Sequence, residues 1–305
     1  MPTVSVIVPT RNRAALWQSA WLMDSLRDQD DQPDELVIAL DHTEDDTLET
    51  ITADITTRPV HFPVRILEVL APRPEPFPAS GTPDNCLFHA ATGDILLHVD
   101  DDIALAPGTV RHARTLLHEL PRAALWYLMT FVDENRRALA AGADWRLALA
   151  SRLRLPLLPG GIMQPPATSS AFTGAIFATT RTALHAIGGH DMRHVGYHNQ
   201  DTRLGNRLLR YCIGSSYIIA TPSLTALHFG LTWHMQNVTN TRALRSAYGA
   251  TLTGPTIANA GERFWSSDYF ATAYRELKLD TLPFPATLKQ RAALDRKVRS
   301  AARAV

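Results

Sequence analysis

Few cysteines, no net charge and no long apolar run characterise this sequence, and each absence excludes a class of protein. Its 305 residues include two cysteines, Cys86 and Cys212, which lie far apart and form no C-x-x-C pair. This spacing argues against a disulfide framework and a zinc site, and it predicts a protein of the reducing cytoplasm. No stretch reaches transmembrane length and no basic, then apolar, leader opens the chain, so we expect neither a membrane span nor a secretory signal.

Charge and glycine content exclude two further classes. The 30 Lys and Arg residues balance the 30 Asp and Glu residues, so no overall electrostatic field attracts nucleic acid. We interpret the basic segment at residues 289–303 as a solvated terminal helix. Where a dinucleotide-binding enzyme would carry G-x-G-x-x-G after the first strand, residues 9–13 are Pro-Thr-Arg-Asn-Arg, which argues against a dehydrogenase.

Short apolar runs alternate with amphipathic segments along the first part of the chain, which predicts α/β architecture. Strands are expected at residues 4–8, 35–40, 64–70 and 94–99, with helices at 14–27, 47–55 and 84–91. Beyond residue 122 we expect strands at 125–129, 172–178 and 217–220, helices at 181–187 and 201–211, and an insertion at about 136–166. Such alternation is typical of a largely parallel sheet covered by helices on both faces.

Three consecutive carboxylates, Asp100, Asp101 and Asp102 (the Asp triplet), end the apolar strand that begins at residue 94. Like charges so close together repel, and burial raises their pKa values unless a cation or hydrogen-bond donors compensate. A hard cation such as Mg²⁺ binds one or two carboxylates together with phosphate oxygens, so the triplet points to a metal that carries a nucleotide diphosphate. The alternative is a polar turn that ends the strand, because aspartate is common in turns.

Other polar residues also follow predicted strands. Arg11 and Arg13 follow the first strand, and Asp41 follows the second. In parallel α/β sheets, ligands bind at the carboxyl ends of the strands. These side chains should therefore converge with the Asp triplet on one rim of the sheet.

Several segments together resemble the family 2 glycosyltransferases, which have the GT-A fold. The resemblance covers about residues 3–230 and rests on the order and spacing of its pieces. These pieces are Val-Ser-Val-Ile-Val-Pro-Thr-Arg-Asn-Arg at 4–13, Asp41 with Asp45-Asp46-Thr47, the run 91–102 with Pro107-Gly108, Phe-Thr-Gly-Ala at 172–175, Gly188-Gly189-His190-Asp191, and residues 196–201 followed by Leu204 and Arg207.

The resemblance implies a fold and a domain organisation. The fold is a mostly parallel central sheet flanked by helices. Residues 1–230 would form the GT-A domain, with a Rossmann-like nucleotide-sugar-binding half at 1–110 and an acceptor half at 111–230 that carries the catalytic base and the insertion. Residues 231–305 would form a C-terminal extension, helical and packed on that domain.

Two residues of the Asp triplet match the D-x-D pair of that family. The resemblance makes Asp102 the direct metal ligand and places Asp100 nearer the ribose or a metal-bound water. Asp101, between them, is counted with the nucleotide-binding residues. His228 resembles a histidine that some GT-A enzymes add as a third metal ligand, with His234 as the alternative. Carboxylates with imidazole suit Mn²⁺ as well as Mg²⁺.

Residues of the first two loops match the family's nucleotide-binding positions. Pro9, Thr10 and Arg11 resemble part of the nucleotide cradle. Asp41 resembles the carboxylate that accepts a hydrogen bond from the nucleobase, although His42 stands where the family usually has glycine. An N-cap of the following helix is the alternative role for Asp41.

Asp201 resembles the carboxylate that activates the acceptor in inverting members of the family. The residue before it is commonly Glu in the family and is Gln200 here. As a general base, Asp201 would take the proton of an acceptor hydroxyl while that hydroxyl attacks the anomeric carbon. The alternative is that Asp201 caps the helix predicted after it.

The resemblance therefore implies transfer of a hexosyl group from a nucleotide-diphosphate sugar, with a UDP-sugar favoured, to an acceptor hydroxyl with inversion. A retaining GT-A enzyme, a nucleotidyltransferase and a sugar-nucleotide-binding protein without catalysis are the alternatives. The acceptor is open between a small molecule, a glycan and a peptide, and so is the oligomeric state. Trp145, Trp233 and Trp265 are candidates for stacking on a flat acceptor.

Overall fold

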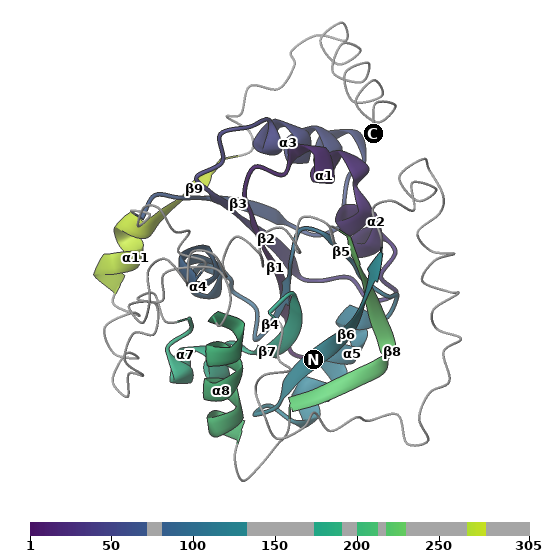
Figure 1. Ribbon diagram of the computed structural model, residues 1–305, viewed down its shortest axis with the longest axis vertical. Coiled ribbons are helices and arrows are strands. Elements are labelled where there is room, and N and C mark those ends of the chain that lie inside the picture. The colour runs from purple at the N-terminus through teal and green to yellow at the C-terminus, as the bar shows by residue number, and fades with distance from the viewer. Residues whose placement is uncertain (72–80, 133–173, 191–199, 213–217, 230–266, 279–305) are drawn as a thin grey trace, which may run out of the picture.

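A mixed sheet organises the part of the chain that the computed structural model describes, residues 1–71, 81–132, 174–190, 200–212, 218–229 and 267–278 (Figure 1). Its strands are β1 (Val4–Thr10), β2 (Glu35–Asp41), β3 (Val64–Val69), β4 (Ile95–Val99), β5 (Ile103–Ala104), β6 (Ala124–Val132), β7 (Ile176–Thr180), β8 (Ile218–Phe229) and β9 (Tyr274–Leu277). Across these described residues the strand order is β5-β8-β6-β7-β4-β1-β2-β3-β9.

Four parallel strands, in the order β4-β1-β2-β3, form the centre of the sheet. Almost every residue of β1, β2 and β4 is buried, which is why these segments are nearly continuous apolar runs in the sequence. β7 pairs antiparallel with β4, and β9 pairs antiparallel with β3. The predicted parallel centre flanked by helices is confirmed, and antiparallel strands extend it on both sides.

Helices cover both faces of the sheet (Figure 1). The described helices are α1 (Ala14–Ser19), α2 (Trp21–Arg27), α3 (Thr47–Thr57), α4 (Gly81–Ala90), α5 (Thr109–Glu119), α7 (Arg181–Ile187), α8 (Gln200–Cys212) and α11 (Ser267–Ala273). One apolar core contains Val6 with residues of α1, α2, α3 and α5, and a second contains Ile7 with residues of α4, α7, α8 and α11. Of these described helices, none has the length and apolar character that a membrane crossing requires.

Three predicted elements differ from the structure. The strand predicted at 172–178 begins only at Ile176, after a turn at 174–175, and ends at Thr180. The segment 14–27 is two helices, because Ala20 adopts a left-handed conformation (φ 56°) and its N–H bonds to the carbonyl of Trp17. The strand predicted at 217–220 continues to Phe229, so His228 lies within β8 and not after a strand. The insertion predicted at about 136–166 lies outside the described residues.

Residues 267–277 of the C-terminal extension add a helix and an edge strand to the domain. Arg65 of β3 binds Glu276 of β9 through two nitrogens, at 3.0 and 2.7 Å. Phe270 of α11 stacks on His89 of α4, with ring centroids 4.2 Å apart. This part of the extension therefore packs on β3 and α4, and it contains a strand that the helical expectation did not include.

The buried carboxylate of Glu35 links the amino ends of the parallel strands through hydrogen bonds. Glu35, the first residue of β2, is 6% exposed and accepts hydrogen bonds from Ser5 Oγ (2.6 Å), Thr92 N (2.6 Å) and Thr92 Oγ1 (2.8 Å). The Arg65 guanidinium lies 3.2 Å from it. Burial opposes ionisation, but these hydrogen bonds outweigh it and hold the pKa of Glu35 below its ordinary value.

Replacing Glu35 with glutamine is expected to lower the free energy of unfolding at pH 7 by about 2 kcal/mol, because hydrogen bonds to a charged group are stronger than neutral ones. The loss should shrink in acid. The folded pKa lies below the unfolded value near 4.5, so the wild-type advantage is present above that value and disappears as pH falls through the folded pKa. Urea unfolding at pH 7 and pH 3 measures both, and equal losses at the two pH values would contradict the ionic role.

Candidate functional site

The Asp triplet lies where β4 ends, at the carboxyl edge of the central strands. The side chains of Asp101 and Asp102 are 7% and 5% exposed. The backbone N–H of Asp100 donates to the carbonyl of Ala175 at 2.8 Å, and the N–H of Ile103 donates to the carbonyl of Asp100 at 3.2 Å. The triplet is therefore a turn fixed by backbone hydrogen bonds, in which the carboxylates of Asp101 and Asp102 are withdrawn from water.

Burial and mutual repulsion raise the pKa values within the triplet. Burial raises the pKa of Asp100 to about 7, and the charges of Asp201 and Asp101 add to the effect. Burial, then the charges of Asp101 and Asp100, raise the pKa of Asp102 well above its ordinary value. A divalent cation would relieve this repulsion, so the oxygen ligands present fit a hard metal. Among the described side chains, no three His, Cys, Asp or Glu groups already have the arrangement of a metal site.

The last residue of β1, Thr10, and Arg13 in the loop after it both contact the triplet. Thr10 Oγ1 donates to Asp101 Oδ2 at 2.5 Å and accepts from Trp17 Nε1 at 2.9 Å. The Arg13 guanidinium lies 3.9 Å from both Asp101 and Asp102. Asp101 therefore joins the triplet to the loop, a connection that the sequence did not indicate.

The predicted nucleotide-binding residues of the first two loops are neighbours. Pro9 and Thr10 are the last two residues of β1, and exposed Arg11 follows them. Asp41 is the last residue of β2, the strand beside β1. Burial raises the pKa of Asp41, while the charges of His42 and Arg11 lower it. The structure thus brings the candidates of both loops to the same edge as the Asp triplet.

Asp41 does not cap the helix that follows it. α3 begins at Thr47, whose N–H donates to the Asp45 carboxylate at 3.0 Å, so the N-cap alternative for Asp41 is wrong. His42 has a left-handed backbone conformation (φ 48°), which glycine adopts at lower cost. Its Nε2 lies 3.0 Å from the carbonyl of Ala71, a contact that a glycine at this position could not make.

Asp201 is the second residue of α8 and packs against the backbone of Gly174. The N–H of Gly174 hydrogen-bonds to the Asp201 carboxylate. A Cβ at position 174 would lie 2.4 Å from Asp201 Oδ1, so glycine is required for this approach. Burial raises the pKa of Asp201 to about 6; the charge of Asp84 adds to the rise, and the Gly174 bond and His98 oppose it. Such a carboxylate is suited to general-base catalysis near neutral pH.

Gly174 and Ala175, two consecutive residues just before β7, contact Asp201 and Asp100 respectively. Gly174 binds the side chain of Asp201, and the carbonyl of Ala175 accepts the N–H of Asp100. Gly174 and Ala175 are consecutive in the chain, so the two carboxylates are close, and the charge of Asp201 raises the pKa of Asp100. The structure therefore brings the candidate base and the Asp triplet into one site.

The backbone of His228 lies beside the triplet. β8 pairs His228 with Ile103, the residue that follows Asp102. The side chain of His228 lies outside the part of the chain that the structure describes. So do four other candidates, His234, Trp145, Trp233 and Trp265.

A buried polar cluster behind the triplet was absent from the sequence prediction. Asp84 of α4 lies 3.0 Å from His98 Nε2 and 3.4 Å from His190 Nε2. Each imidazole stacks on a phenylalanine, His98 on Phe177 and His190 on Phe88. Two weak signals were available in the sequence. Asp84 lies in a helix with apolar residues, and His98 lies two residues before Asp100, on the same face of that strand.

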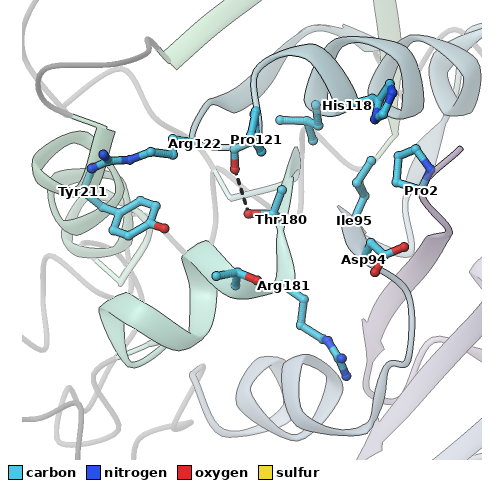
Figure 2. Close-up of a pocket in the computed structure, with 11 residues that line it drawn as sticks. Pro2, Asp94, Ile95, His118, Pro121, Arg122, Thr180, Arg181 and Tyr211 are labelled. Atoms are coloured by element: carbon cyan, nitrogen blue, oxygen red, sulfur yellow. Dashed lines mark hydrogen bonds between the residues drawn. The ribbon is translucent and has the colours of Figure 1, made fainter.

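A cavity of about 380 Å³ lies at the opposite edge of the sheet, and Figure 2 shows residues that line it. Asp94 and Ile95, where β4 begins, line it with Arg122 and with Thr180, whose hydroxyl donates to the carbonyl of Pro121 at 3.0 Å. None of the predicted site residues that the structure describes lines this cavity. It is therefore separate from the carboxylates at the other end of the strands.

Sequence comparison gives one family match. The family model described as Glycosyl transferase family 2 matches residues 5–177, a span that contains the first two loops and the Asp triplet. No curated protein sequence matches the chain.

Solved structures share the fold at low sequence identity. S. aureus TarS 1-349 in complex with UDP is 16% identical with a TM-score of 0.53, over 81% of this chain and 66% of that chain. The mannosyltransferase PcManGT from Pyrobaculum calidifontis, in complex with GDP-Man and Mn2+, is 18% identical with a TM-score of 0.52, over 98% and 80%. GalNAc-T7 with UDP, GalNAc and Mn2+ is 13% identical with a TM-score of 0.51, over 75% and 44%. The chain thus spans less than two thirds of TarS 1-349.

Proposed function

Because the chain belongs to glycosyl transferase family 2 and has the GT-A fold, we propose that it moves a hexosyl group from a nucleotide-diphosphate sugar to an acceptor hydroxyl. The observation that carries this proposal is the meeting of the Asp triplet and Asp201 at Gly174 and Ala175. The Asp triplet is suited to binding a metal-bound diphosphate, and Asp201 is suited to accepting a proton. Similar structures solved with UDP, UDP-GlcNAc and GDP-Man support a sugar nucleotide as donor.

Asp102 and Asp100 would hold the divalent cation, Mn²⁺ or Mg²⁺, with His228 as a third ligand. When bound, such a cation neutralises the charge that develops on the diphosphate leaving group. The raised pKa values of Asp100 and Asp102 support the assignment, because they mark crowded negative charge in a buried place. Two of the similar solved structures contain Mn2+.

The chain's own groups would bind the nucleotide beside that cation. Pro9, Thr10 and Arg11 form one side of the nucleotide site at the end of β1, and Asp41 accepts an N–H of the base at the end of β2. Uracil and guanine both offer such an N–H. We favour a UDP-sugar because UDP is bound in two of the three similar structures compared above.

Asp201 would take the proton of the acceptor hydroxyl while the oxygen attacks the anomeric carbon, and a single displacement inverts the configuration. Its pKa of about 6 leaves it ionised at neutral pH and still basic. Asp84 provides the neighbouring negative charge that Gln200 does not, and it raises the pKa of Asp201. A partly buried carboxylate with a shifted pKa in this position favours an enzyme over a sugar-nucleotide-binding protein without catalysis.

We propose the cytoplasm as the compartment of this protein. Cys86 is a buried free thiol, and burial raises its pKa to about 12. Free cysteines are typical of reducing compartments, whereas disulfides form and persist in oxidising ones.

A thermal-shift panel tests the proposed donor. The ligands are UDP, GDP, dTDP and their sugars, each with and without Mn²⁺ or Mg²⁺. We expect UDP and UDP-sugars to raise Tm in the presence of metal and not in its absence, and a ligand at one hundred times its Kd stabilises by about 2.7 kcal/mol. Metal alone is the control for each pair of samples. No shift with any nucleotide would refute the donor site, and a shift with GDP and not UDP would refute the UDP preference.

A further inference from the structure

Behind the proposed site, a continuous path of contacts joins α8, which carries Asp201, to β4, which ends in the Asp triplet. The path begins at Arg207 of α8, whose guanidinium donates to the carbonyl of Ile187 at 3.0 Å. Ile187 is the last residue of α7. Leu204 and Leu208 of α8 share an apolar core with Leu184 of α7. The helix α8, which carries Asp201, therefore packs on α7 and is hydrogen-bonded to it.

The turn after α7 brings His190 into contact with α4. Gly188 and Gly189 have positive φ values of 74° and 61°, and their N–H groups bond to carbonyls of the last turn of α7. His190 follows them and is 2% exposed. The side chain of Asn85 on α4 binds the backbone of His190 twice, accepting from its N–H at 2.8 Å and donating to its carbonyl at 2.9 Å. The position of His190 relative to α4 is therefore fixed.

Asp84, next to Asn85, completes the path. Its Oδ2 lies 3.4 Å from His190 Nε2, and its Oδ1 lies 3.0 Å from His98 Nε2 on β4. Asp84, His98 and His190 are 7%, 3% and 2% exposed. Burial alone would raise the pKa of Asp84, but the charges of the two histidines and the His98 bond outweigh it and lower that pKa. The carboxylate is thus a buried charge placed between α4, β4 and the turn after α7.

We propose that Asp84 is a positioning residue, which holds α8 and β4 in the relative position that lets Asp201 and the Asp triplet act on one substrate. This inference rests on the proposed transfer reaction. Gly174 and Ala175 join Asp201 to Asp100. Asp84 provides a second, separate link between α8 and β4, through His190 and His98. Directional polar contacts fix one arrangement, whereas apolar contacts depend only on buried area.

A triple variant and a matched control separate positioning from stability. The single change Asp84→Ala does not, because it leaves two buried imidazole nitrogens without their carboxylate and so destabilises the fold. The triple variant Asp84→Leu, His98→Phe, His190→Phe replaces the whole cluster with apolar side chains beside Phe177 and Phe88, and a buried ionic group is often replaced in this way without loss of stability. We expect the triple variant to keep its Tm and its Kd for UDP with Mn²⁺, and to lose about 10-fold to 100-fold in kcat, because a shift of about 1 Å has effects of that size.

Thr179→Val is the matched control. Thr179 is buried in β7 and donates to the carbonyl of Ala123 at 3.0 Å, so the variant loses a buried hydrogen bond away from the cluster. It should lower Tm and leave both kcat and Kd as in the wild type. A triple variant with wild-type kcat would overturn the inference, and so would one whose Kd rises as much as its kcat falls, because the cluster would then act on donor binding.

A distance measurement tests the inference without any enzymatic activity. Spin labels at Asn206→Cys on α8 and Thr115→Cys on α5, two exposed positions, are introduced with Cys212→Ser. We expect a broader distribution of distances in the triple variant than in the protein with the native cluster. An unchanged distribution overturns the positioning role even if sugar transfer is never observed, whereas a wild type that binds no nucleotide counts against the proposed function alone.

Discussion

Replacing Asp201 with asparagine is expected to lower kcat for sugar transfer by about 10³-fold, since a general base contributes about 10²- to 10⁴-fold. Asparagine has the size of aspartate, and its carbonyl oxygen can still accept the N–H of Gly174, but it cannot take a proton from the acceptor. We place the donor at the Asp triplet in the proposed function, so the donor Kd of this variant should change little. Steady-state kinetics and nucleotide titration measure the two quantities on the same protein.

The pH profile of the wild type provides a second readout of Asp201. The base must be ionised, so kcat should rise with pH, about tenfold per unit below the pKa, and level off above a pKa of about 6. The Asn variant should lose this dependence along with its activity. Saturating metal is needed in the assay, because the pKa of Asp100 is about 7 without it and would titrate in the same range.

Asp94→Asn is the control for the charge that Asp201→Asn removes. Asp94 is exposed at the amino end of β4, where it accepts hydrogen bonds from Thr3 at 2.9 and 3.0 Å. Its replacement removes one negative charge at the edge of the sheet opposite the site, and kcat should not change. If Asp201→Asn weakened donor binding as strongly as it lowered kcat, or left kcat unchanged, Asp201 would not be the base.

The central part of the fold was predictable because its signals are local. β1, β2 and β4 are buried on both faces, so each appears in the sequence as a short apolar run. The break at Ala20 was not predictable, because alanine is a helix former and nothing in the local sequence marks its left-handed conformation. The edge strand β9 depends on pairing with β3, a contact between distant parts of the chain.

The same distinction applies to the candidate site. The Asp triplet and Asp201 stood out because a few adjacent residues carry each signal, and the structure places them together. Asp84, His98 and His190 come from three separate parts of the chain, and the weak signals at Asp84 and His98 do not predict that these residues meet. Their cluster follows from the packing of α4 against β4 and against the turn after α7, which no short segment records.

Replacing Asp102 with alanine is expected to raise the donor Kd in the presence of Mn²⁺ by about 100-fold, because the cation that Asp102 would hold would neutralise the diphosphate charge and contribute several kcal/mol. The same variant should be at least as stable as the wild type without metal. The folded pKa of Asp102 is raised above its ordinary value, so at neutral pH its ionised form costs stability, and alanine removes that cost. Thermal unfolding with and without Mn²⁺ and UDP measures both effects in one experiment.

Asp101→Asn shows whether the effect belongs to Asp102 or to the summed charge of the triplet. Asp101 carries the same charge one residue away, but Thr10 donates to it at 2.5 Å, and the carbonyl oxygen of asparagine can accept that bond. A repulsive field adds over all nearby carboxylates, whereas coordination depends on particular oxygen atoms. If Asp102 is the ligand, the Asp101 variant should keep most of the metal-dependent shift in Tm. Equal losses in the two variants would mean that charge alone attracts the cation, and the assignment of Asp102 as the direct ligand would then fail.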